Sequence, residues 1–316
     1  MPESIYFFVM LLSFIFLAAL KIPISVSLMF SAICGALVSG NFFPIRHLVE
    51  GSFGYMDAIL IIATAMIFME SIRVSGLLED FAQRIAKRFR NRPLFLLMIM
   101  TLFIMSAGMI TGSSSAAVLT TGAIAYPVLK DLGLEKRRAG ALIAMTAIFG
   151  MIAPPINIPA MIIGQGVDMP FIGFTKPLLL LTVPLAVISA LMIGAKHVKK
   201  VNAELFENIE SFSKKWYLYI PIVVLVFLMI LENVSTFSLG LPLIFILCSL
   251  MAALMSKKNF LQISVKALKE SISILSILIG VGMFIQIMTL NGTRGLIVDY
   301  LNNLPEMALI AGIALG

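Results

Sequence analysis

Apolar runs of about 20 residues recur along nearly the whole chain, and they constrain its fold more than any other feature. A helix needs a run of this length to cross the hydrocarbon core of a bilayer. Only 12% of the 316 residues are charged, roughly half the share that a soluble domain carries. The pattern predicts an all-α polytopic membrane protein. We expect apolar elements at about residues 5–20, 23–40, 56–75, 94–110, 114–129, 139–165, 177–195, 216–231, 236–255 and 271–290.

The distribution of positive charge indicates how the segments on either side of GMITGSSSAAVLTTG (108–122) are arranged. They can form one crossing helix or a hairpin that enters and leaves on the same side. With a hairpin at 94–129, all 23 basic residues except Arg46, Lys176 and Arg294 lie on one side, which an excess of Lys and Arg marks as cytoplasmic. We therefore expect a re-entrant hairpin and a periplasmic N-terminus. This topology also accounts for the net charge of +7, so no nucleic-acid partner is expected.

Two polar segments connect apolar elements on the predicted cytoplasmic side. The segment 76–92 (GLLEDFAQRIAKRFRNR) places Leu77, Phe81 and Ile85 at helical spacing, with basic residues opposite. Such a sequence is typical of an amphipathic helix lying at the membrane surface. We expect an interfacial arm helix there, with a solvated loop as the alternative. The segment 196–215 is expected to be a cytoplasmic linker between two halves of the protein.

A weak internal similarity indicates a repeat. MIFMESIRVSG (66–76) aligns with GMFIQIMTLNG (282–292), sharing the phenylalanine at the third position and the terminal glycine. By the charge-based topology the two copies run in opposite directions, as in inverted-repeat transporters. We expect a first repeat at 1–195 and a partial second repeat at 216–316. Because the second copy of the hairpin tip would lie beyond Gly316, we expect a longer functional chain that completes the second repeat.

Two stretches of irregular backbone fall at membrane depth. The hairpin tip 111–115 (TGSSS) is rich in hydroxyl groups, and 150–160 (GMIAPPINIPA) contains prolines that cannot continue a helix. Irregular backbone inside a bilayer survives only when buried in protein or lining a watery cavity. Free carbonyls beside uncharged hydroxyls suit Na⁺, and helices beginning near Ser114 and Pro159 would direct positive dipole ends at a carboxylate. The pattern predicts a site for Na⁺ and an organic anion.

Other readings of these residues remain open. Small residues and prolines also serve close packing and helix kinking in membranes. Asn157 is either a buried polar pin or a substrate contact, and Glu70 with Arg73 is expected to form a pair or to snorkel to the interface rather than to act in transport. His47 and His197 fall in predicted loops, so no metal site is expected. Because no nucleophile with a base and no acid pair lies at membrane depth, an enzyme is not expected.

The sequences GMITGSSSAAVLTTGAIAYPVLKDLG and FGMIAPPINIPAMIIG resemble the large membrane subunit of tripartite ATP-independent periplasmic (TRAP) transporters. These belong to a wider ion-transporter superfamily of inverted-repeat elevator carriers, and the resemblance covers the whole chain. It implies Na⁺-coupled import of a small organic acid across the inner membrane, with Na⁺ as the coupling ion and no cofactor. It also implies two partners, which are a soluble periplasmic binding protein that delivers the substrate and a small four-helix membrane subunit that braces the scaffold.

The resemblance also implies site residues by motif position. The Na⁺ ligands would be the hydroxyls of Thr111 and Ser114 and the carbonyls of Gly150, Ala153 and Pro155. We assign Ser113, Ser115 and Asn157 to the substrate. Thr111 stands where serine is usual, which keeps the hydroxyl. APPIN (153–157) replaces a pattern in which serine follows the double proline, so the kind of acid stays open. The family's second sodium site would lie beyond Gly316.

The implied mechanism is an elevator, in which 94–165 and its counterpart slide against a scaffold. That scaffold would comprise 5–40, 177–195 and 216–255, with the interfacial arms as levers. The rival functions are a single-component ion-coupled anion carrier of the same superfamily, a passive channel and, more remotely, a membrane-embedded enzyme. Uptake with and without a binding protein separates the first two functions, and saturation of the flux separates a carrier from a channel.

Overall fold

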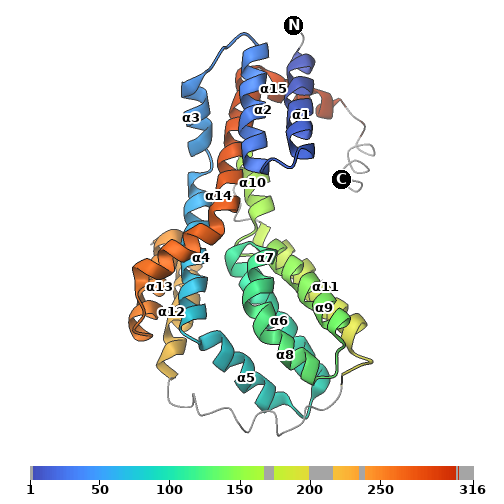
Figure 1. The fold of residues 1–316 in the computed structure, drawn as a ribbon, viewed down its shortest axis with the longest axis vertical. Coiled ribbons are helices and arrows are strands. Elements are labelled where there is room, and N and C mark those ends of the chain that lie inside the picture. The colour runs from blue at the N-terminus through green and yellow to red at the C-terminus, as the bar shows by residue number, and fades with distance from the viewer. Residues whose placement is uncertain (1–2, 167–173, 199–215, 235–238, 304, 306–316) are drawn as a thin grey trace. The chain divides into compact units, whose positions relative to one another are not determined.

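The computed structural model describes residues 3–166, 174–198, 216–234, 239–303 and 305, and within these ranges the chain is helical without any strand (Figure 1). The N-terminal helices are α1 (Glu3–Ala19), α2 (Ile24–Val38), α3 (Ile45–Phe53), α4 (Met56–Val74), α5 (Leu77–Phe89), α6 (Pro93–Thr111), α7 (Ser114–Ala117) and α8 (Ala123–Asp131). The remaining helices are α9 (Lys136–Ile152), α10 (Ile158–Gly166), α11 (Thr175–Gly194), α12 (Ile220–Val234), α13 (Leu241–Met255), α14 (Phe260–Leu290) and α15 (Thr293–Asn302).

The lengths of the apolar helices agree with a multi-pass membrane protein. Among the described residues, α6, α11 and α14 are each long and apolar enough to cross a bilayer, with 19, 20 and 31 residues. The pair α3 and α4 passes the same test as one span bent by 47°. The shorter α1, α2 and α13 are also apolar, as are residues 216–232, which comprise a 3-10 turn and most of α12. The predicted all-helical polytopic class is therefore supported by both length and composition.

The structure differs from the sequence-based expectation in the extent of two elements. The segment before α4 was expected to be a connection, but it forms the short helix α3, because IRHLVEGSF alternates apolar and polar residues at helical spacing without being a long apolar run. Helix α14 begins at Phe260 rather than near 271, because the polar stretch before its apolar part also favours a helix. The predicted linker 196–215 lies almost wholly outside the described residues, as do the final residues 306–316.

Residues 1–59 and 272–316 form one compact unit. Within it α1 packs against α2, where Ser31 Oγ donates a buried hydrogen bond to the Met10 carbonyl and Ser13 Oγ donates to Ser31 Oγ at 3.1 Å. Met10 fills the space beside Gly35, where an added Cβ would lie 2.4 Å from the Met10 Cγ. The buried core of this unit comprises Met10, Ala32, Ala36, Leu48 and Ile287.

The same unit contains a close crossing of α3 and α14. A Cβ added at Gly282 would lie 2.0 Å from the Gly51 carbonyl oxygen, and one at Gly51 would lie 2.6 Å from the Gly282 oxygen. Only two glycines allow backbones to approach this closely, which is a common way for membrane helices to associate. Beside the crossing, Gln286 Nε2 donates to Glu50 Oε2 at 3.4 Å.

Residues 60–271 form the second compact unit, which contains the predicted hairpin and broken helix. Helix α6 packs along α9, and α11 packs against both of them. The fully buried residues at this junction are Met105, Ala153 and Ala186. Helix α5 occupies the segment predicted as an interfacial arm (76–92) and contacts α6 and α8. Its place at the membrane surface stays a prediction.

The two segments aligned as a sequence repeat end in the same local backbone geometry. After α4, Gly76 has φ of +77° and is followed directly by α5. After α14, Gly292 also has φ of +77° and is followed directly by α15. Glycine adopts this left-handed conformation at little cost, so both long helices end in a sharp turn into a short helix. The two compact units combine segments from both predicted repeats, and the repeat boundaries remain a prediction.

Candidate functional site

The hairpin tip is formed where α6 ends at Thr111. Gly112 follows in the left-handed conformation, with φ of +63°, and its N–H donates to the Gly108 carbonyl at 2.7 Å. Ser113 is extended and caps the returning arm, because its Oγ accepts a hydrogen bond from the Ala116 N–H at 3.2 Å. The two helices thus form a helical hairpin, with a glycine that closes one helix and a serine that opens the next. That the hairpin enters and leaves the membrane on the same side stays a prediction.

Thr111 is the most deeply buried of the hydroxyl residues in the tip, because only 1% of its surface is exposed. Its Oγ1 donates to the Ala107 carbonyl at 2.7 Å and accepts from the Ser113 N–H at 3.3 Å. One bond is to a backbone group of α6 and the other to a backbone group of the tip. A hydroxyl oxygen has two lone pairs, so this arrangement leaves acceptor capacity on Thr111 Oγ1.

The second irregular stretch is the break between α9 and α10. Helix α9 ends at Ile152, Ala153 is extended with φ of −75° and ψ of 149°, and α10 resumes at Ile158. Asn157 is 2% exposed and bonds at both ends of its amide. Its Nδ2 donates to the Ile152 carbonyl, and its Oδ1 accepts from the Ala160 N–H at 2.9 Å. Asn157 therefore fastens the end of one helix to the beginning of the next, which is the behaviour of a buried polar pin.

The tip and the break are in contact. The Ile156 N–H, in the break, donates to the Met109 carbonyl near the end of α6 at 3.2 Å. A Cβ added at Gly112 would lie 2.8 Å from Ile158 Cγ1 and 2.9 Å from Ile156 Cγ2. The two irregular stretches, 42 positions apart at Gly112 and Pro154 in the sequence, thus form one site, which we call the tip–break site (residues 111–115 and 150–160).

The tip–break site is held together by a close crossing of α6 and α9, formed by Gly108 and the site residue Gly150. A Cβ added at Gly150 would lie 2.5 Å from the Met105 carbonyl oxygen, and one at Gly108 would lie 2.8 Å from the Gly150 carbonyl carbon. Any larger residue at either position would push α6 and α9 apart. The backbone approach at Gly108 and Gly150 therefore sets how closely the tip can pack on the break.

The returning arm of the hairpin contains a feature that sequence reasoning missed. Residues Val118–Gly122 form a π-helical segment between α7 and α8. Within it, buried Thr121 donates from Oγ1 to the Ile104 carbonyl of the descending arm at 3.2 Å and also to the Ala117 carbonyl. A π-turn shifts the following side chains relative to an α-helix, and here Thr121 ties the two arms together. The three threonines of GMITGSSSAAVLTTG indicated a polar segment, but they did not indicate a π-helical turn.

The predicted site residues differ in how deeply they are buried. Thr111, Ser113, Gly150, Ala153 and Asn157 are buried, Ser114 and Pro155 are half-buried, and Ser115 is exposed. No charged residue occurs in 101–129 or 139–166, so polarity at the site comes from hydroxyl, amide and backbone groups alone. The carbonyl of Gly150 accepts a bond from the Ala153 N–H at 3.2 Å. The role of each residue as a sodium or substrate ligand remains a prediction.

A second buried polar region in this unit is made of charges. Glu70 is 4% exposed, with Arg73 Nε 2.8 Å from its Oε2 and Lys266 Nζ 3.0 Å from its Oε1. Arg73 also approaches Glu270, at 3.9 Å. The predicted pairing of Glu70 with Arg73 is confirmed, and Lys266 and Glu270 of α14 are additional members. We call these four residues the Glu70 cluster, which links α4 to α14 and is balanced in charge.

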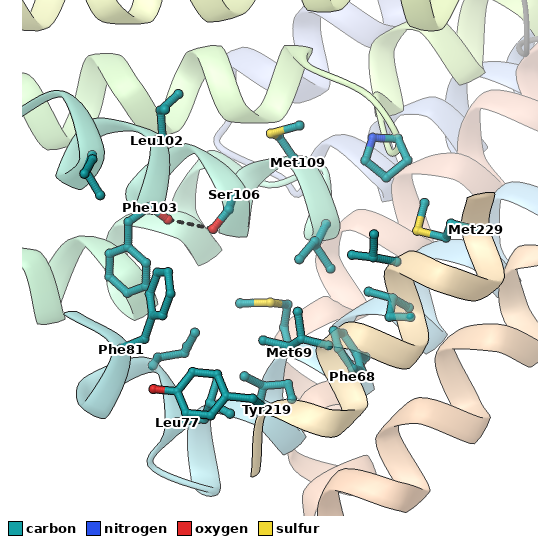
Figure 2. Close-up of a pocket in the computed structure, with 18 residues that line it drawn as sticks. Phe68, Met69, Leu77, Phe81, Leu102, Phe103, Ser106, Met109, Tyr219 and Met229 are labelled. Carbon is teal, nitrogen blue, oxygen red and sulfur yellow. Dashed lines mark hydrogen bonds between the residues drawn. The ribbon is translucent and has the colours of Figure 1, made fainter. Parts of the chain in front are cut away.

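An apolar pocket of about 480 Å³ adjoins the tip–break site on the side of α4, α5 and α12 (Figure 2). Figure 2 shows Phe68 and Met69 from α4, Leu77 and Phe81 from α5, and side chains of α6 facing this space. Met109 and Pro155 lie at the end of the pocket nearest the tip–break site. Sequence patterns did not predict it, because it depends on how four helices meet. Among the described residues, no group of three His, Cys, Asp or Glu is placed to hold a metal ion.

Comparison with known proteins agrees with this geometry. The family model of the tripartite ATP-independent periplasmic transporter, DctM component, matches residues 11–315. The sialic acid TRAP transporter large permease protein SiaM of Vibrio cholerae is 26% identical over 131 residues, which is 40% of this chain and 30% of that relative. The aligned part therefore covers less than a third of the relative's length, whereas the family model covers nearly the whole chain. On that match, the chain belongs to the DctM family, the large membrane component of TRAP transporters.

Proposed function

We propose that this chain forms the transport pathway of a Na⁺-coupled importer for a small organic acid. The observation that carries the proposal is the contact between the hairpin tip and the helix break, made by Ile156, Met109 and Gly112. Two broken helices meeting without any charged side chain provide oxygen donors of the hard, neutral kind that hold a monovalent cation weakly enough to release it. Membership of the DctM family, whose characterised function is transport rather than catalysis, supports this class of activity.

In this proposal Na⁺ binds the hydroxyls and carbonyls predicted from the sequence. Thr111 Oγ1 would supply a buried hydroxyl ligand and Ser114 a half-buried one, with the carbonyls of Gly150, Ala153 and Pro155 completing the shell. The returning arm begins at Ser114 and α10 begins at Ile158, so both helices would present positive dipole ends to a bound carboxylate. Ser113 and Ser115 would contact the substrate, and Asn157 would act mainly through the shape of the break.

The proposal includes the arrangement of a TRAP system. A periplasmic binding protein would deliver the acid, and a small four-helix membrane subunit would brace the scaffold. The chain would lie in the inner membrane with its N-terminus in the periplasm, and the hairpin with its broken helix would move as an elevator. The name of the Vibrio cholerae relative specifies sialic acid, and a sugar acid is one member of the proposed substrate class.

The test is uptake by the intact transporter carrying a change at Thr111. Thr111→Val keeps the side-chain volume and removes the hydroxyl ligand, so we expect uptake to need about tenfold more Na⁺, equivalent to the loss of one net interaction. Thr111→Ser restores the hydroxyl and should restore the Na⁺ dependence. Thr101→Val is the matched control, because Thr101 is fully buried in the same helix and bonds only the Leu97 carbonyl, at 2.8 Å. Equal Na⁺ dependence in Thr111→Val and Thr101→Val would contradict the assignment.

A further inference from the structure

The apolar pocket beside the tip–break site is formed by segments that are far apart in the sequence. Its lining consists of 18 residues from α4, α5, α6, the break and the start of α12. All of these except Ser106 and Tyr219 are hydrocarbon, methionine or proline side chains. Its volume of about 480 Å³ lies within the range of about 300–1,000 Å³ found for small-ligand sites.

The two hydroxyl groups of the lining are already used by the protein. Ser106 Oγ donates to the Phe103 carbonyl of its own helix at 2.7 Å, as the dashed line in Figure 2 shows. The Tyr219 hydroxyl donates to Asp80 Oδ2. An ordered water needs two to four polar partners, and an apolar cavity without them stays dry. The interior therefore suits a hydrocarbon chain and does not suit water or a polar solute.

The pocket is elongated along α6. The lining residues of that helix extend from Ile99 to Ile110, which corresponds to about 16 Å at the rise of an α-helix. They recur at spacings of three and four residues and so form one continuous face of the helix. A long apolar channel of this kind matches an extended acyl chain better than a compact solute.

Basic residues of α5 lie beyond the apolar lining at one edge of the pocket, and they indicate the kind of headgroup. Along α5, Leu77 and Phe81 line the pocket, and the same helix face continues through Arg84 to Arg88. Arg84 pairs with Asp80 at 2.6 Å and lies 5.9 Å from the centre of the Tyr219 ring, at the pocket's edge. Arg88 and Lys87 are exposed, and within the described residues no carboxylate lies within ion-pair distance of either.

We propose that this pocket binds one acyl chain of an anionic phospholipid, with the lipid phosphate held at Arg84 and Arg88. The continuous stripe from apolar to cationic residues on α5 complements the tail and headgroup of such a lipid. Packing of the chain against the apolar lining removes apolar surface from water, and the guanidinium groups favour an anionic phosphate over a zwitterionic headgroup. The inference concerns lipid binding and does not depend on the proposed transport function.

The test is native mass spectrometry of the purified protein after exchange into detergent containing equal amounts of phosphatidylglycerol and phosphatidylcholine. We expect one retained phosphatidylglycerol in excess over phosphatidylcholine. Leu102→Trp fills the pocket from α6 and should lower the bound phosphatidylglycerol about tenfold. Leu94→Trp is the matched control, because Leu94 is 45% exposed on the same helix and does not line the pocket.

The headgroup is tested separately. Arg88→Gln should reduce the preference for phosphatidylglycerol over phosphatidylcholine about threefold, whereas Arg92→Gln, beyond the end of α5, should not. Equal lipid occupancy in Leu102→Trp and Leu94→Trp would overturn the site, and an unchanged preference in Arg88→Gln would overturn the anionic headgroup. If Leu102→Trp melts at a much lower temperature than the wild type, Ser106→Leu, a smaller filling change, replaces it with the same expected loss.

Discussion

The tip–break site and the Glu70 cluster bury polar groups within the same compact unit by opposite means. In the tip–break site, Thr111 and Asn157 bond backbone groups, and no charged side chain is present. In the Glu70 cluster, a carboxylate 4% exposed is held between Arg73 and Lys266. A buried carboxylate that is already paired with two cationic side chains has little negative charge left to bind a third cation. The contrast supports the proposal that the neutral region binds a cation reversibly, whereas the charged one joins helices.

The largest effect on stability is expected from adding a side chain where α6 and α9 approach each other closely. In Gly150→Ala the new Cβ would lie 2.5 Å from the Met105 carbonyl oxygen, so α6 and α9 must separate. We expect a loss of about 3 kcal/mol in the free energy of unfolding, measured by denaturation in detergent, because the obstacle is backbone and cannot rotate away. Gly140→Ala is the control on the same helix, since nothing lies within 4 Å of its Cβ. Equal stability of the two variants would contradict the described crossing.

A smaller loss is expected from the charged region. Glu70→Gln keeps the shape of the side chain but leaves Arg73 and Lys266 without their shared carboxylate. Since both cations are partly exposed, we expect about 2 kcal/mol of destabilisation rather than the larger cost of a fully buried pair. The effect of Na⁺ on the melting temperature should be unchanged in Glu70→Gln. This outcome distinguishes the Glu70 cluster from the tip–break site. Glu50→Gln, in the exposed pair with Arg46, should leave the melting temperature as it is.

The hydrogen bond that joins the two hairpin arms should contribute less to stability than the Glu70 cluster does. Thr121→Val removes the bond from Oγ1 to the Ile104 carbonyl, at 3.2 Å, and should cost about 1 kcal/mol in the free energy of unfolding. Thr120→Val is the neighbouring control, because Thr120 bonds only the Ala116 carbonyl of its own arm. Thermal melting of both variants distinguishes a link between the arms from a general loss of hydroxyl groups. A greater loss in Thr120→Val would contradict the link.

The smallest effect is expected at Asp131, a half-buried carboxylate at the end of the returning arm. Burial raises the pKa of Asp131, and the nearby charge of Lys130 opposes this only in part. The folded state therefore binds the proton more tightly than the unfolded state, and stability falls as the pH rises from the usual aspartate range through the raised pKa. Asp131→Asn should add about 0.3 kcal/mol at neutral pH after solvent screening and should flatten this acid-range dependence. A steeper pH dependence in Asp131→Asn would show that another group is responsible.

The backbone irregularities of the candidate site could be predicted from the sequence because single residue types enforce them. Pro154 and Pro155 cannot continue α9, whereas Pro159 lies in the first turn of α10, where a missing N–H is tolerated. Gly112 followed by serines is typical of a helix end beside a cap. Positive charges on flanking segments then favoured a hairpin over a crossing helix. The pairing of Glu70 with Arg73 was also predictable, because the two residues are three positions apart in one helix.

Features that depend on distant contacts could not be predicted in this way. Lys266 and Glu270 join Glu70 and Arg73 from almost 200 positions away, and no local pattern indicates that α14 passes there. The pin at Asn157 depends on the break bringing Ile152 and Ala160 within reach of one amide. The short helix α3 was missed because it has only 9 residues and is amphipathic rather than a long apolar run. The π-helical segment was missed because no local pattern indicates it. Sequence reasoning indicated the two irregular stretches, and the structure added how they are joined.

The central claim, that the tip–break site binds Na⁺, is tested most directly by the melting temperature of the purified protein in NaCl against choline chloride. At a Na⁺ concentration about ten times the dissociation constant, binding to one site stabilises the folded state by about 1.4 kcal/mol. We predict that Na⁺ raises the melting temperature of the wild type and of Thr101→Val, and that Thr111→Val removes the increase. An equal Na⁺ response in all three proteins, or no response in the wild type, would contradict the assignment of the site.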